Sequence, residues 1–233
     1  MLDTITNTVF VPIQRAGRPF IVGFALATIV LFALFSPLGW IGLALTVWCT
    51  YFFRDPERYT PVRSGLIVSS ADGLVQAVGL AMPPPELALS ETPRMRISVF
   101  MNVFDVHVNR IPASGTITRI AYVPGAFVNA SLDKASDKNE RNGLVIETAD
   151  GRALAVVQIA GLVARRITCW LAEGQDVQAG QRLGMIRFGS RVDVYLPDGV
   201  APLVSPGQRM IAGESVIADL DGAEPARRAE RRP

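Results

Sequence analysis

The sequence has one histidine and two cysteines among its 233 residues, so it offers few side chains that bind transition metals. Cys49 and Cys169 are far apart and form no Cys-x-x-Cys pair or other metal-ligand spacing. Structural zinc sites are typically built from about four Cys and His ligands, and we therefore expect no metal centre. We interpret both thiols as reduced side chains that contribute to packing.

Charge is also scarce, with 19% charged and 49% hydrophobic residues and a net charge of +2. That net charge lies in the segment Ala223–Pro233, where Arg outnumbers Glu. The rest of the chain is neutral, which argues against nucleic-acid-binding proteins that need a broad basic face. We expect no nucleic-acid partner. Residues 222–233 are predicted to form a disordered basic tail.

A long stretch without any charged residue runs from Pro19 to Phe53. Pro37 and Gly39 interrupt it, which predicts two helices, about 20–35 and about 39–53. At roughly 1.5 Å per residue each helix is about 22–24 Å long, shorter than the ~30 Å hydrocarbon core of a bilayer. Residues 1–58 are therefore predicted to form a membrane-associated hairpin that is short or only partly inserted.

Arginines flank this stretch at both ends, Arg15 and Arg18 before it and Arg54 and Arg58 after it. Positive residues favour the cytoplasmic side, so we expect both ends at the cytoplasmic face of the cell membrane. Two alternatives stay open. The first is a cleaved signal peptide, which would leave the second apolar half unexplained. The second is a buried hairpin in the core of a soluble protein, against which the complete lack of charged residues argues.

Residues 59–221 contain short apolar runs separated by glycine, and two patterns recur. One pattern includes Ala71–Val75 and Ala113–Ile117, and the other pairs Val177–Leu183 with Met210–Val216. Glycine at fixed places before alternating apolar residues indicates tight turns between short strands. We predict a mainly β body, a sandwich or flattened barrel, with repeats like those of biotinyl and lipoyl barrel-sandwich domains.

The dipeptide Gly189–Ser190 stands between two alternating apolar runs. Ile186 and Phe188 precede it, and Val192, Val194 and Leu196 follow it, which predicts two strands that meet at a Gly-Ser corner. Packing does not require a serine there. In a strained corner its hydroxyl could attack the preceding carbonyl, whereas the alternative is an ordinary turn.

Three further residues are candidates for proton transfer. His107 is the only side chain whose unperturbed pKa lies near neutral pH, although a lone histidine on a strand is often structural. Asp105 lies two residues earlier, so the alternation of a strand would place it on the same face as His107. Asp72, before Gly73, is the other candidate to orient His107, or else it caps a turn.

With its flanks, Gly189–Ser190 resembles the self-cleavage site of the pyruvoyl-dependent phosphatidylserine decarboxylases, specifically the short proenzyme type, and the rest of the chain fits from about residue 19 to 220. The run from Asp105 through His107 to Pro112 resembles the family's Asp-aromatic-His-Arg-Val-His-Met-Pro signature, and Asp72 resembles the Asp of its Asp-Gly turn. Arg110 replaces the second His of the longer enzymes. Either His107 then serves more than one step, or Arg110 takes over part of the work.

The resemblance implies that Ser190 attacks the Gly189 carbonyl with help from Asp72 or His107, which splits the proenzyme into a large and a small chain. Residue 190 would become a covalent pyruvoyl cofactor that forms a Schiff base with phosphatidylserine. His107 would then protonate the carbanion left by loss of CO2, and phosphatidylethanolamine would be released. The implied partners are the phospholipid substrate and the cell membrane, and a homodimer is open.

Two other functions are weighed against this one. A membrane-tethered lipoyl-like adaptor without catalysis would explain the apolar hairpin and the repeats, but not the Gly189–Ser190 corner. No lysine lies between Gly180 and Gly189 to act as a carrier. A serine hydrolase that uses Ser190 and His107 would need Ser190 to stay intact.

Overall fold

The computed structural model describes residues 11–125, 139–161, 166–187, 189–227 and 229. The chain divides into two compact units, Met1–Glu57 and Arg58–Pro233. Several predicted features fall outside the described residues: most of a polar stretch at 131–138, Phe188, and tail positions 228 and 230–233.

The first unit is a pair of helices, α2 (Arg18–Leu34) and α3 (Ser36–Phe52), preceded by the 3-10 turn η1 (Arg15–Gly17). The predicted break is narrower than the sequence suggested, because only Phe35 separates the helices. Pro37 lies in the first turn of α3, where its missing N–H has no helical partner to lose. Gly39 is inside α3, and a Cβ there would clash with the Phe32 ring.

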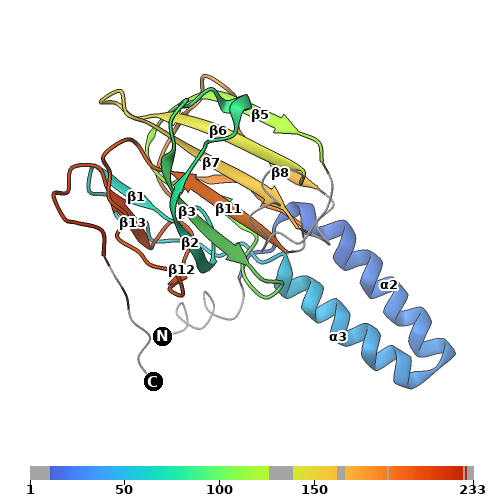
Figure 1. Ribbon diagram of the computed structural model, residues 1–233. Coiled ribbons are helices and arrows are strands. Elements are labelled where there is room, and N and C mark those ends of the chain that lie inside the picture. The colour runs from blue at the N-terminus through green and yellow to red at the C-terminus, as the bar shows by residue number, and fades with distance from the viewer. Residues whose placement is uncertain (1–10, 126–138, 162–165, 188, 228, 230–233) are drawn as a thin grey trace. The chain divides into compact units, whose positions relative to one another are not determined.

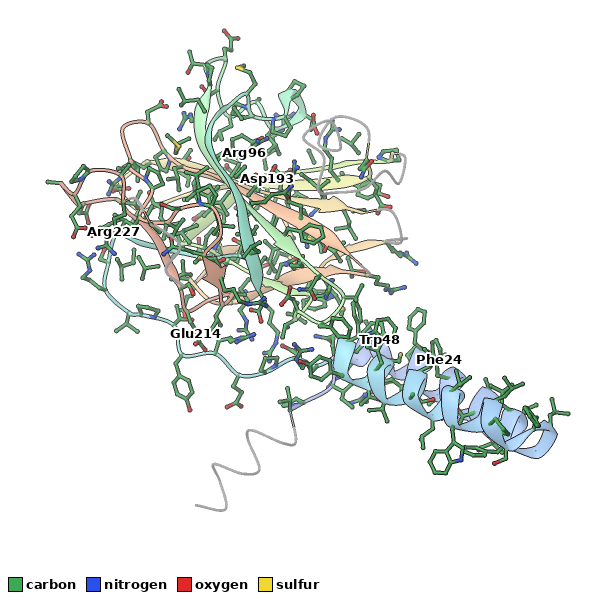
Figure 2. The ribbon with its side chains drawn as sticks, turned by 60° about the horizontal axis from the view of Figure 1, so that its bottom comes forward. Phe24, Trp48, Arg96, Asp193, Glu214 and Arg227 are labelled. Carbon is green, nitrogen blue, oxygen red and sulfur yellow. The ribbon has the colours of Figure 1, made fainter. Side chains whose placement is uncertain are left out.

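Most of the outer surface of this helix pair is apolar, and its side chains project outward around both helices (Figure 2). Only a few positions of the two helices are buried, and one of them makes a polar contact: Thr28 Oγ1 lies 2.9 Å from Oγ1 of the half-buried Thr46. The segment Arg15–Leu34 is long and apolar enough, by length and composition, to cross a membrane. This apolar segment indicates membrane association.

The second unit is built from short strands, as Figure 1 shows. Its elements are β1 (Leu66–Val68), β2 (Gly73–Ala81), η2 (Pro85–Leu87), β3 (Arg94–Met101), β4 (Val108–Arg110), β5 (Gly115–Val123), β6 (Arg141–Glu147), β7 (Ala153–Ala160), β8 (Ile167–Cys169), β9 (Asp176–Val177), β10 (Arg182–Ile186), β11 (Ser190–Tyr195), β12 (Arg209–Met210) and β13 (Val216–Asp219). The predicted mainly β fold is confirmed, with a sheet that curls into a half-barrel.

The strands form three antiparallel sheets. The largest has eight strands in the order β12-β2-β3-β11-β7-β6-β5-β9, and β4-β10-β8 and β1-β13 form the smaller two. The inner face of the large sheet packs with the smaller sheets around one apolar core, to which β11 contributes Val192 and Val194. The outer face has its own smaller cluster around Leu87 of η2 and Tyr195.

The chain after β13 has no regular structure in its described part, residues 220–227 and Ala229. The backbone of Arg227 is nevertheless held, because its N–H donates to Pro202 O at 3.1 Å and its carbonyl accepts from Ser205 Oγ at 2.9 Å. The described beginning of the predicted tail therefore lies along the β body.

Candidate active site

The predicted corner at Gly189–Ser190 is where the chain passes from one sheet to another. β10 ends at Ile186 in the three-stranded sheet, and β11 begins at Ser190 in the large sheet. Gly189 has φ +65°, a left-handed backbone conformation that is strained for any residue with a side chain. Nothing lies within 4 Å of the position that a Cβ would take. Backbone conformation rather than crowding therefore requires glycine before the serine.

Ser190 is the first residue of a central strand. It is paired with Met101 of β3 on one side and with Ala160 of β7 on the other. Its side chain has no exposed surface, and its Oγ has no hydrogen-bond partner among the described residues. Buried hydroxyls are normally satisfied, and Ser70 and Ser98 Oγ are also buried without a partner among the described residues. What distinguishes Ser190 is the left-handed glycine before it, which makes it a candidate reactive position.

His107 lies on a segment that runs beside this corner. That segment, residues 102–107, connects β3 to β4, just as residues 187–189 connect β10 to β11. The two connections share their neighbours, because β3 pairs with β11 and β4 pairs with β10. Ile186 N–H also donates to the His107 carbonyl at 3.4 Å. The fold therefore brings Ser190 and His107, both fully buried, to one junction between two sheets.

The tautomer of His107 follows from its partner. Nδ1 lies 2.9 Å from the backbone carbonyl oxygen of Asp105. A carbonyl can only accept a hydrogen bond, so Nδ1 carries a proton, and when the ring is neutral Nε2 is the basic nitrogen. This is the form that a general base requires.

The prediction that Asp105 and His107 share one face of a strand is wrong, because residues 102–107 are not a strand. Asp105 N–H donates to Asn102 O at 3.0 Å, and the Asp105 carboxylate accepts from Asn102 N–H at 2.9 Å. Its other oxygen accepts from Arg209 at 2.5 Å. Asp105 therefore orients His107 through its carbonyl, while its carboxylate fixes the turn.

Asp72 lies at the same end of the large sheet, one residue before β2. Its carboxylate accepts from Arg58 at 2.7 Å and from Ala212 N–H at 2.8 Å. Burial raises the pKa of Asp72, while Arg58 and the Ala212 N–H act in the opposite direction. Among the described residues these two groups hold the carboxylate, so the structure does not place Asp72 in hydrogen-bond contact with His107.

Arg110 points elsewhere. Its guanidinium is buried and donates to Gly180 O at 2.8 Å, in the turn between β9 and β10. Asn109, the preceding residue of β4, faces the opposite side of the strand, toward Met101. At least one donor of the Arg110 guanidinium is therefore engaged by the β9–β10 turn.

A chain of buried amides was not predicted from the sequence. Asn142 Nδ2 donates to Gln158 Oε1 at 3.1 Å, Gln158 Nε2 donates to Asn109 Oδ1 at 2.8 Å, and Asn109 Nδ2 lies 3.4 Å from Met101 Sδ. This chain of amides joins β6 and β7 to Asn109 of β4, which lies two residues after His107. It ends at Met101, the residue that is paired with Ser190. The signal in the sequence that could have revealed this chain is the presence of Asn and Gln at inward-facing positions of otherwise apolar strands.

The other face of β11 carries buried charge. Arg191 Nε lies 2.9 Å from Asp193 Oδ1, with both side chains about 1% exposed. Arg96 of β3 lies 3.9 Å from Asp193, and Figure 2 shows these two labelled side chains near each other. Burial, with the Asp193 charge, raises the pKa of Tyr195 to about 12.

Comparison with known proteins identifies the family. Residues 45–218 match the model of the phosphatidylserine decarboxylase family. A phosphatidylserine decarboxylase proenzyme of Paramagnetospirillum magneticum is 61% identical over 229 residues, which cover 98% of this chain and 95% of that protein. Proteins of the same description from Cereibacter sphaeroides and Ruegeria pomeroyi are 59% identical over 97% of this chain and 60% identical over 92%, and 98% of each protein is covered. A lipoyl-like adaptor is not supported, and the chain belongs to the phosphatidylserine decarboxylase family.

Proposed function

We propose that this chain cleaves itself between Gly189 and Ser190 and then, with the pyruvoyl group formed at residue 190, converts phosphatidylserine to phosphatidylethanolamine and CO2. The observation that carries this proposal is the buried, unsatisfied Ser190 Oγ beside Gly189 in a left-handed conformation. The family gives the reaction and the word proenzyme implies processing. A serine hydrolase would need Ser190 to stay intact, whereas this proposal consumes it.

Self-cleavage uses the atoms of the corner itself. Ser190 Oγ bonds to the Gly189 carbonyl carbon, the peptide C–N bond breaks, and the hydroxyl proton passes through His107 Nε2 to the released amine. The resulting ester then loses the Cα proton of residue 190 and its C–O bond, which frees Gly189 as a carboxylate. The remaining enamine tautomerises, and water replaces its nitrogen, which leaves as ammonia. The large chain ends at Gly189, and the small chain begins at residue 190.

The residues present fit a reactive group at this position. After cleavage, residue 190 is still the first residue of β11, held between Met101 and Ala160. A pyruvoyl group supplies a ketone that bonds the substrate amine and accepts the electrons released when CO2 leaves. His107 Nε2 then holds the proton that replaces the lost carboxylate. The apolar core around Val192 excludes bulk water from this step.

The hairpin, residues 1–58, supports access to a lipid substrate. A diacyl lipid stays in the bilayer, so the catalytic body, residues 59–221, must work at the headgroup layer. The arginines on both sides of the apolar stretch favour the cytoplasmic face of the cell membrane. The large and small chains would stay together, because β11 of the small chain is paired on both sides with strands of the large chain.

The proposal is tested with phosphatidylserine labelled in the serine carboxyl group. We expect purified protein to release the label as CO2 and to form phosphatidylethanolamine. Borohydride, which reduces a ketone, should abolish turnover and add two hydrogens to the small chain. Labelled CO2 release that borohydride does not affect would contradict a pyruvoyl enzyme.

Asp72 is tested by the pH dependence of self-cleavage. Because burial raises its pKa, Asp72 takes up a proton at higher pH than an ordinary aspartate. If its negative charge assists His107, cleavage of freshly translated protein should slow as the pH falls through that raised pKa. Asp72→Asn should cleave slowly at every pH, and a variant that cleaves like the native chain would remove Asp72 from the mechanism.

A further inference from the structure

Exposed apolar side chains gather on the outer rim of the site, next to the turn that holds His107. We propose that this rim, formed by Leu74, Phe104, Arg209 and Ile211, is a membrane-contact surface of the β body that rests on the headgroup layer of a phosphatidylserine-containing bilayer. The inference rests on the proposed function and deepens it, because it states where on the body the lipid substrate arrives.

The first observation is exposure. Phe104 is 61% exposed, and Leu74 and Ile211 are each 42% exposed, in a body whose other apolar residues mostly form buried clusters. Phe104 immediately precedes Asp105, whose carbonyl holds His107. A single exposed apolar side chain needs no explanation, but several beside a reactive position indicate an interaction surface.

The second observation is that the members of the rim are joined to one another. Leu74 of β2 pairs with Arg209 of β12. Met210 is buried while Arg209 and Ile211 are exposed, so these two side chains share the outer side of β12 and its extension. Arg209 then reaches across to the turn, where its guanidinium lies 2.5 Å from the Asp105 carboxylate, next to Phe104.

The chemistry of the rim fits a lipid surface. An aromatic ring and aliphatic side chains beside an exposed arginine are typical of groups that lie at the headgroup level of a bilayer. Arg209 is 66% exposed, so its stem can lie along apolar surface while the guanidinium donors that do not face Asp105 reach lipid phosphates. The substrate requires such a contact, because its headgroup must reach residue 190 while its acyl chains stay in the membrane.

The test compares two forms of the same substrate with full-length protein. One form is vesicles that contain dioleoyl phosphatidylserine, and the other is dihexanoyl phosphatidylserine below its critical micelle concentration. For Phe104→Ser, we expect the ratio of kcat/KM on vesicles to kcat/KM on the monomeric lipid to fall roughly tenfold, the loss expected when one buried phenyl ring no longer contacts the bilayer. Phe104→Leu should recover most of the ratio.

Leu80→Ser is the matched control. Leu80 is 72% exposed and lies on β2 like Leu74, but at the far end of the strand, opposite Met95. It should leave the ratio unchanged, and Ile211→Ser should lower it like Phe104→Ser, which covers the case in which a change in the turn prevents folding. Self-cleavage of each variant, seen as two chains on a gel, reports that the body has folded.

Three results would overturn the inference: an unchanged ratio in both Phe104→Ser and Ile211→Ser, an equal fall in Leu80→Ser, or a change in oligomeric state in detergent without a change in the ratio. The last result would make the rim a contact between copies of this chain. Failure of the proposed function looks different, because native protein would then neither cleave nor turn over the monomeric lipid.

Discussion

The helical hairpin and the β body contain the same kinds of apolar side chain but place them in opposite environments. Leu26, Ile29 and Trp40 of the hairpin are each more than half exposed, whereas Val99 and Val192 of the body are buried. A helix that is apolar on all sides is suited to lipid as a solvent, and a buried apolar cluster is suited to water outside. The first unit is therefore suited to a lipid environment and the second to an aqueous one.

Polar groups differ between the two units in the same way. The hairpin partly buries the contact between Thr28 and Thr46, and each hydroxyl also lies within hydrogen-bond distance of a carbonyl of its own helix. The body buries His107, Ser190 and a chain of amides, and three of its buried hydroxyls, those of Ser70, Ser98 and Ser190, lack a partner among the described residues. The described part of the hairpin thus satisfies its buried hydroxyl locally, while the body leaves some buried hydroxyls unsatisfied, among them the proposed nucleophile Ser190.

The largest expected effect is that of Ser190→Ala. No hydroxyl is left to attack Gly189 and no pyruvoyl group can form, so both cleavage and decarboxylation should be lost on every form of substrate. Gel electrophoresis and CO2 release measure the two properties. Ser190→Thr keeps a hydroxyl and should cleave slowly. An active, processed Ser190→Ala enzyme would contradict the proposal that the body supplies the reactive group from Ser190.

His107→Ala should have the next largest effect. Loss of a general acid or base typically reduces a rate by about 10²–10⁴-fold, so cleavage of newly made chain and turnover by any cleaved enzyme should both fall by that order. The loss should be equal on vesicles and on monomeric lipid, because His107 lies in the body. Normal cleavage with normal turnover would mean that His107 is structural.

Deletion of residues 1–53 should, unlike His107→Ala, affect vesicle-bound substrate more than dispersed substrate. The body should still fold and cleave itself, because its strands begin at Leu66. Activity on vesicles should fall about tenfold, the effect of losing only ~1.4 kcal/mol of membrane partitioning, with a smaller loss on detergent-dispersed lipid. Equal activity of both forms on vesicles would show that the hairpin does not serve substrate access.

The smallest pair of effects compares buried polar groups in the two units. Gln158→Leu leaves Asn109 and Asn142 without their amide partner and should lower the free energy of unfolding by about 1–3 kcal/mol. Thr28→Val removes only one interhelical contact and should cost less, about 0.6 kcal/mol. Thermal unfolding in detergent measures both, and a larger loss for Thr28→Val would reverse the comparison.

The sequence predicted the parts of the fold that depend on local pattern. Alternating residues around Gly189 predicted the two strands, and the charge-free stretch around Pro37 predicted the helix pair. The pattern failed at Asp105, because the Asn102 side chain accepts from Phe104 N–H and the Asp105 carboxylate accepts from Asn102 N–H, which favours a turn over a strand.

The partners of the site residues could not be predicted for a different reason. Arg209 is far from Asp105 along the chain, Ala212 is far from Asp72, and Gln158 is far from Asn109. Such contacts depend on the order of strands in the sheets, and no local pattern records that order. Family resemblance supplied the role of Ser190, but only the fold showed that its hydroxyl is buried and that Asp105 holds His107 through its backbone.

The intact mass of the purified full-length protein tests most directly whether Ser190 is consumed to make the reactive group. We predict two polypeptides, residues 1–189 with a free carboxyl end and residues 190–233 with a ketone in place of the first amine and hydroxyl groups. The small chain should resist amino-terminal sequencing. A single chain with an unmodified Ser190, in a preparation that decarboxylates phosphatidylserine, would contradict the proposed mechanism.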